Sequence, residues 1–152
     1  MADDIRPLPD LYEADFYAWT QAQAALIARL GRSGRLPEAL DWPRLAEEVG
    51  DLGKSDLRGA ESLVRNIIVH LALLQAAQRQ EPMRHWRAEV LAFRQDLRAR
   101  LTPSIRRKLM DTLEMLHQDG LALAEAKLAA HEPEAQPPSS ALRWTLEDIL
   151  GA

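Results

Sequence analysis

Two histidines and two glutamates are the residues of this sequence best suited to metal or acid–base chemistry. They are His70, Glu89, Glu114 and His117. Glu114 and His117 have the Glu-x-x-His spacing of metal sites in helical bundles, and imidazoles with carboxylates suit zinc or another divalent transition metal. Matching antiparallel helices at their turns places all four at similar height. One hypothesis is therefore a divalent metal or acid–base site. The alternative is that His70 forms a hydrogen bond at the core edge while His117 is exposed.

A second group of residues could bind anions. It consists of arginines that share one side of an expected helix and continue across the next turn: Arg84, Arg87, Arg94, Arg98, Arg106 and Arg107. Residues 79–108 hold nine Arg or Lys against three acids, although the formal net charge of the whole chain is -4. Such a stripe can contact an acidic protein surface or a second copy of the chain, or the phosphates of nucleic acid. It can also be a solvated helix face.

The segment EEVGDLGKSD, residues 47–56, combines acids with glycines inside an expected helix. Most of its acids point away from the apolar stripe, as solvated charges usually do. Glu48 lies on the flank of that stripe and is the functional candidate of the segment. Gly53 falls within the stripe, at the expected level of Phe16 and Trp19, so we expect it to make room for an aromatic ring.

The elements that position these residues are helices. Leu and Ala together number 49, whereas Val, Ile and Thr number 14, so the residue types that favour helices dominate. The prolines lie where a helix is expected to begin or to be absent. Four long helices are expected, over about residues 10–30, 42–78, 82–101 and from 103 to a Pro-rich linker at 132–141. Residues 1–9 are expected to form a flexible tail.

Capping residues support these boundaries, because Ser, Thr, Asp and Asn at a helix start accept hydrogen bonds from free backbone N–H groups. Asp10, Asp41 and Thr102 are the expected caps of the first, second and fourth helices. After the linker, Thr145 with Asp148 has capping-box spacing and predicts a short C-terminal helix that docks on the rest.

These signals predict an all-α fold. We expect a single domain over residues 1–152, with four main helices around the long second helix and the docked C-terminal helix. Whether the second helix is continuous or bends at Gly50 and Gly53 stays open. The chain has no cysteine, which excludes disulfides and thiolate chemistry. Its acidic N-terminus is not a signal peptide, and its longest uncharged run, 66–78, is too short to span a bilayer, so a cytoplasmic location is expected.

Enzyme motifs are missing from the sequence. It holds no Gly-rich phosphate loop, no G-x-S-x-G nucleophile elbow and no H-E-x-x-H. We therefore expect a non-enzymatic interaction or self-associating module without a cofactor. The alternatives are a metal-binding helical-bundle enzyme that uses the His and Glu cluster, and a weak nucleic-acid binder that uses the arginine stripe.

Four segments together resemble a known family. They are LYEADFYAWTQAQAALIARLG, LAEEVGDLGKSDLRGAESLVRNIIVHLALLQ, HWRAEVLAFRQDLRARLTPSIR and WTLEDIL. Nearly the whole chain is similar to the bacterial family called domain of unknown function 29. The resemblance implies an all-helical bacterial protein, and it implies no activity, cofactor or catalytic residue, because none is established for the family.

Overall fold

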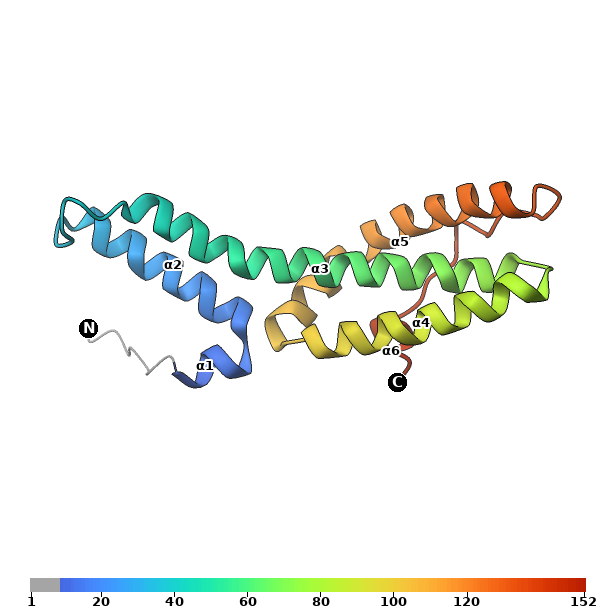
Figure 1. Cartoon of the computed structure of the whole chain (residues 1–152), viewed down its shortest axis with the longest axis horizontal. Coiled ribbons are helices and arrows are strands. Elements are labelled where there is room, and N and C mark those ends of the chain that lie inside the picture. The colour runs from blue at the N-terminus through green and yellow to red at the C-terminus, as the bar shows by residue number, and fades with distance from the viewer. Residues whose placement is uncertain (1–8) are drawn as a thin grey trace. The chain divides into compact units, whose positions relative to one another are not determined.

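The computed structural model describes residues 9–152, which form helices and no strand (Figure 1). The helices are α1 (Pro9–Ala14), α2 (Phe16–Arg32), α3 (Trp42–Ala76), α4 (Gln80–Arg100), α5 (Pro103–His131) and α6 (Leu146–Leu150). The all-α prediction is confirmed. None of the helices in this part of the chain combines the length and apolar character needed to cross a bilayer. The predicted flexible tail lies outside the described residues, except for Pro9, which begins α1.

The described chain forms two compact units. The first contains the residues up to Arg58 together with Thr102–Arg106, and the second contains Gly59–Leu101 with Arg107–Ala152. Helix α3 is continuous from Trp42 to Ala76, so Gly50 and Gly53 do not interrupt it.

In the first unit, the predicted helix over residues 10–30 is divided into α1 and α2 at Asp15. The backbone of Asp15 leaves the helical region, with φ -155° and ψ 81°. The Asp15 carboxylate accepts hydrogen bonds from the backbone N–H of Ala18 (3.0 Å) and, across the unit, of Ser104 (2.8 Å). One buried side chain therefore caps both α2 and α5. The expected cap Asp10 instead lies inside α1.

The other predicted caps are confirmed. Asp41 Oδ1 accepts from the backbone N–H three residues on at 3.4 Å, and Thr102 Oγ1 does the same at 3.3 Å. Thr145 and Asp148 form the predicted capping box at the start of α6. These bonds act within one helical turn, which is why sequence spacing was sufficient to predict them.

Gly53 does provide clearance for α2, but the neighbour is not aromatic. A Cβ at Gly53 would overlap Thr20 Oγ1, and Thr20 is fully buried. Phe16 and Trp19 instead pack with Tyr12, whose ring centroid lies 5.4 Å and 4.8 Å from theirs. The predicted ring at Gly53 is thus wrong, because the actual register of α2 against α3 brings a small polar residue to that position.

Alanine at the two glycines should have opposite effects on the free energy of unfolding. Gly53→Ala is expected to destabilise the protein by about 1–3 kcal/mol through overpacking against Thr20. Gly50→Ala places its Cβ 3.6 Å from Ala24 Cβ, an ordinary contact. It should stabilise the protein by about 0.5–1 kcal/mol, because alanine is the better helix former. Urea denaturation followed by circular dichroism measures both, and equal behaviour of the two variants would contradict the packing explanation.

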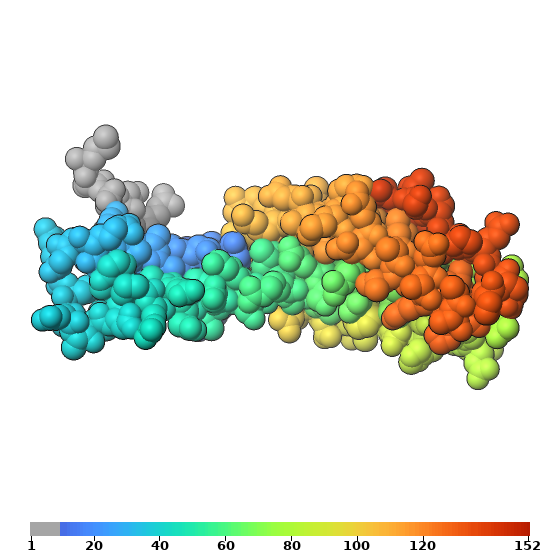
Figure 2. Space-filling model, turned by 90° about the horizontal axis from the view of Figure 1, so that it is seen from above, coloured from blue at the N-terminus to red at the C-terminus, as the bar shows by residue number. Residues whose placement is uncertain are grey.

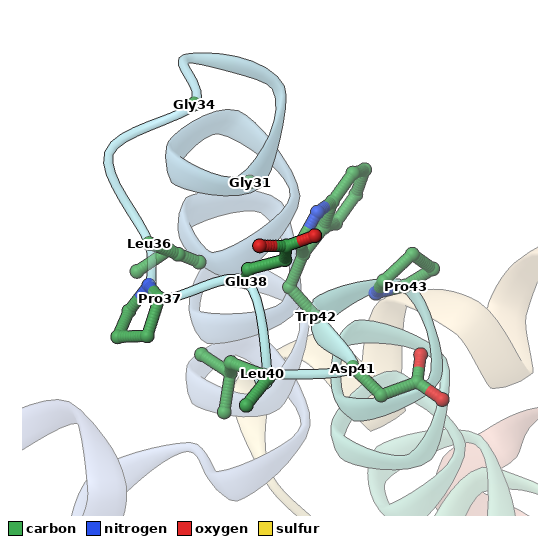
Figure 3. A pocket seen from close by; sticks show the side chains of 10 residues that line it. Gly31, Gly34, Leu36, Pro37, Glu38, Leu40, Asp41, Trp42 and Pro43 are labelled. Atoms are coloured by element: carbon green, nitrogen blue, oxygen red, sulfur yellow. The ribbon is translucent and has the colours of Figure 1, made fainter.

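The turn between α2 and α3 is shown in Figure 3. A Cβ at Gly31 would overlap the indole of Trp42, and Gly34 has a φ of +70° that favours glycine. A hollow of about 500 Å³ is lined by this turn. Its two acids are Glu38 and Asp41, and Asp41 is already used as the cap of α3. Nothing else that lines the hollow is titratable, so it offers no catalytic group of residues.

The second unit contains the buried apolar core. Figure 2 shows α5, in orange, lying along the green part of α3. The contact is close at Gly120, where a Cβ would lie 2.8 Å from Ile68 Cγ2. The largest fully buried apolar side chains of this unit are Val64, Ile67, Ile68, Leu73, Leu97, Leu109, Leu128, Leu146 and Ile149.

A buried carboxylate connects the end of α5 to the start of α4 in this unit. Glu132 follows directly after α5, with a relative exposure of 1%. Its two oxygens accept hydrogen bonds from the backbone N–H groups of Gln78 (3.0 Å) and Arg79 (3.1 Å), just before α4. Arg79 is the N-cap residue of α4 and forms no side-chain cap bond itself. Glu132 therefore satisfies N–H groups at the start of α4 that its own segment leaves free.

Candidate functional site

His70 and Glu89 form a direct contact between α3 and α4. His70 is buried, its Nε2 lies 2.5 Å from Glu89 Oε2, and its Nδ1 lies 2.7 Å from the backbone oxygen of Asn66. Phe93 packs edge-on against the imidazole, with ring centroids 5.4 Å apart. Of the four residues predicted as a cluster, these two are brought together.

The two acceptors around His70 determine where its protons lie. A backbone carbonyl only accepts, so Nδ1 must carry a proton that it donates to Asn66. Glu89 offers a carboxylate to Nε2, and a hydrogen bond there needs a further proton on one of the two groups. The imidazole thus bridges the Asn66 carbonyl of α3 and the Glu89 carboxylate of α4.

Three residues that the sequence interpretation did not use lie around this pair. His85 Nε2 lies 3.3 Å from Glu89 Oε1, so both oxygens of Glu89 are engaged. Lys127 and His131 join His70, His85 and Glu89 in lining a cavity of about 450 Å³. His85 precedes Glu89 by four residues and Lys127 precedes His131 by four, the spacing that places side chains on one helix face. That spacing is the sequence signal that could have found them.

Glu114 and His117 bind the C-terminal segment instead of His70 and Glu89. The Glu114 carboxylate forms two hydrogen bonds with Arg143, at 2.9 and 2.7 Å, and these bonds hold the pKa of Glu114 below its ordinary value of 4.5. His117 is buried. Its Nδ1 donates to the backbone oxygen of Leu113 (2.9 Å), and its Nε2 accepts from the backbone N–H of Trp144 (2.9 Å). Neither nitrogen of His117 is left for a metal ion.

The predicted four-residue cluster is therefore replaced by two separate sets of contacts, one at His70 with Glu89 and one at the C-terminal segment. Over residues 9–152, no three His, Cys, Asp or Glu side chains are grouped in a way that could hold a metal ion. The expected exposure of His117 is also wrong, because the Trp144 ring stacks on it at 6.1 Å.

Two arginines of the predicted stripe bind α6. Arg94 donates to the backbone oxygens of Asp148 (2.9 Å) and Ile149 (2.9 Å), and Arg98 donates to that of Leu150. The last carbonyls of a helix have no partner within it, and cations near that end also favour the helix dipole. Burial, and then the charge of Arg98, lower the pKa of Arg94 from its ordinary value. These two arginines dock the C-terminal helix.

The stripe is thus not one free surface. Arg84 and Arg87 are exposed and form no hydrogen bond or ion pair with the described residues, whereas Arg106 and Arg107 have interactions of their own. Binding of an acidic partner or of nucleic acid through Arg84 and Arg87 stays a prediction.

A different surface of the first unit is apolar. Helix α2 and the first part of α3 form a hairpin, and Gly50 and Gly53 of α3 face α2. Each residue of a helix is rotated by about 100° from the one before it. Counted from the contact between the two helices, the apolar side chains of α2 and of α3 lie at similar angles. Because the helices are antiparallel, these side chains lie on the same side of the hairpin. We call this surface the hairpin face; its residues are Phe16, Trp19, Leu26, Leu30, Leu45, Val49 and Leu52.

Much of the hairpin face is left open by the described residues, although Tyr12 of α1 packs against Phe16 and Trp19. Leu30, Leu45 and Leu52 are exposed by 45%, 43% and 55%, and no large apolar side chain of residues 10–58 is buried. Monomeric proteins rarely expose such contiguous apolar surface without using it for an interaction. Glu48, the flank candidate, is exposed beside this face and has no partner among the described residues.

Comparison with known proteins agrees with the all-helical architecture and assigns no activity. The sequence matches the family described as Domain of unknown function DUF29 over residues 11–152. The chain is similar to a crystal structure of an alpha-helical protein of unknown function from Rhodospirillum rubrum, with 32% identity and a TM-score of 0.79. That alignment covers 91% of this chain and 88% of the other. No curated protein matches the chain. The predicted resemblance is confirmed: the chain belongs to the family Domain of unknown function DUF29.

Proposed function

We propose that this protein is a non-enzymatic, self-associating helical module in which two copies pair through the hairpin face. The observation that carries the proposal is the burial pattern of the first unit. Among the described residues, five of the nine exposed large apolar residues lie from Tyr12 to Leu52, and three of the five belong to the hairpin face. The buried apolar core of the described chain lies in the second unit except for Ile105. The hairpin has the apolar stripes of a helical bundle but only half of the helices that could cover them.

A second copy is the partner that fits this face. Two hairpins brought together by a two-fold axis make a four-helix bundle, in which each stripe is covered by another of the same length and polarity. The seven residues of the face include no charged side chain, and Glu48 lies at its edge, where interfaces are commonly polar. The proposed interface therefore has an apolar centre and a charged rim.

Glutamate on the hairpin face should abolish the association. Leu45→Glu combined with Leu52→Glu is expected to give a monomer, because burying two unpaired carboxylates per copy opposes pairing. Both side chains are exposed in the single chain, so helix content should be retained. Sedimentation velocity over a range of concentrations measures the oligomeric state, and circular dichroism measures the helix content.

A matched control uses exposed apolar residues of the second unit. Leu91 and Leu123 have similar exposure but lie outside the hairpin, so Leu91→Glu with Leu123→Glu should leave the association unchanged. The proposal fails if the unmodified protein is monomeric at every concentration, or if both double variants associate to the same extent.

A further inference from the structure

The cavity beside His70 and Glu89 has the size and lining of a small-molecule site. Its volume of about 450 Å³ falls in the range of ligand pockets, roughly 300–1,000 Å³. It lies entirely within the second unit. Pairs of residues spaced by four contribute from three helices: α3 provides Asn66 and His70, α4 provides His85 and Glu89, and α5 provides Lys127 and His131.

Among the described residues that line the cavity, one is an acid and one is a lysine. Glu89 is the acid, and both of its carboxylate oxygens are engaged by His70 and His85. Lys127 forms no hydrogen bond or ion pair with any described residue. His131 lies four residues further along α5, on the same helix face as Lys127. A free ammonium group therefore lies beside an imidazole, with no carboxylate of the cavity available to it.

The remaining wall of the cavity is apolar and aromatic. Trp86 is buried and Phe93 is partly buried, and both line the cavity with Leu73 and Pro82. The Trp86 and His131 rings are 6.3 Å apart, at 67° to each other. An apolar group in the cavity would thus contact an indole that lies close to His131 of α5.

We propose that this cavity binds a small organic anion. Its carboxylate or phosphate group is held by Lys127 and His131, and its apolar or aromatic body packs against Trp86 and Phe93. The His70–Glu89 pair fixes this wall, because it attaches α4 to α3. No hairpin residue lines the cavity, so the proposal is independent of self-association.

Titration of the full chain with benzoate and with phenyl phosphate tests the proposal, by calorimetry and by the NMR shift of the Trp86 indole N–H. Binding of at least one of the two is expected. Lys127→Gln removes the charge and keeps most of the side chain, and it should weaken that binding about tenfold or more. Lys108→Gln changes an exposed lysine of α5 outside the cavity and should leave the affinity unchanged.

Two further probes separate the parts of the ligand. Benzyl alcohol has the aromatic body without the charge, and inorganic phosphate has the charge without the body; both should bind more weakly than the organic anions. The proposal is overturned if neither organic anion binds, if Lys127→Gln binds them as tightly as the unmodified protein, or if either partial probe binds equally well.

Discussion

Asp15→Ala is expected to lower the free energy of unfolding by about 2–4 kcal/mol, because it uncaps two helices at once. The Asp15 carboxylate accepts from the backbone N–H of Ala18 at the start of α2 and of Ser104 at the start of α5. The side chain is buried, so water cannot fully replace the lost acceptor. Urea denaturation at neutral pH measures the change.

The same residue should contribute a recognisable dependence of stability on pH. Burial raises the pKa of Asp15, but hydrogen bonds from Ala18, Ser104 and Thr102 outweigh it and hold the pKa below its ordinary value of 3.8. A carboxyl whose pKa is lower in the folded state stabilises that state above the unfolded pKa, and this contribution is lost as the pH falls through the folded pKa.

Asp15→Asn isolates this contribution. Asparagine is also a good helix cap, so its oxygen can still accept from Ala18, but its amide group cannot accept from Ser104 and does not titrate. The difference in stability between the two proteins should be constant near neutral pH and should shrink as the pH falls below about 4. A difference that stays constant into the acid range would show that the Asp15 charge is not what stabilises these helix starts.

Glu132→Gln is expected to destabilise the second unit by about 2–4 kcal/mol. Each oxygen of Glu132 accepts from one backbone N–H, of Gln78 or Arg79. Glutamine has nearly the same shape, but its amide NH2 would face one of these N–H donors and leave it without an acceptor. Thermal unfolding followed by circular dichroism measures the loss.

Glu134 provides the matched control for Glu132. It lies two residues further on and forms an ion pair with Arg79 at 3.0 Å, but its side chain is exposed. Exposed ion pairs contribute little to stability, so Glu134→Gln should leave the unfolding midpoint nearly unchanged. Equal effects of the two substitutions would contradict the assigned role of the buried carboxylate.

Several features of the fold could be predicted because their causes are local. Asp41, Thr102 and the Thr145–Asp148 box accept hydrogen bonds from N–H groups within three residues, so their spacing alone located helix starts. The break at Asp15 could not be found in this way. Its carboxylate also binds Ser104, which is 89 residues away in the sequence.

The same difference applies to the candidate sites: one contact between main helices could be predicted, whereas the contacts with the C-terminal segment could not. Matching helix levels placed His70 near Glu89, and the two are in contact. Helix levels alone also group Glu114 and His117 with them, because the levels of the main helices contain no information about contacts with the C-terminal segment. Arg143 and Trp144 of that segment bind these two residues instead. Arg94 and Arg98 looked like a free stripe for the same reason, although they bind the end of α6.

By itself, the sequence determined the all-α class, most helix boundaries and the family. Periodicity, proline positions and capping act over a few residues, so the chain contains that information locally. Only the tertiary structure decided which charged groups are free. It engages Arg94, Arg98, Glu114 and His117 internally, whereas within residues 9–152 it gives Lys127 no partner and leaves much of the hairpin face open. The physical reason is that a side chain's availability depends on partners distant in sequence, which no local pattern specifies.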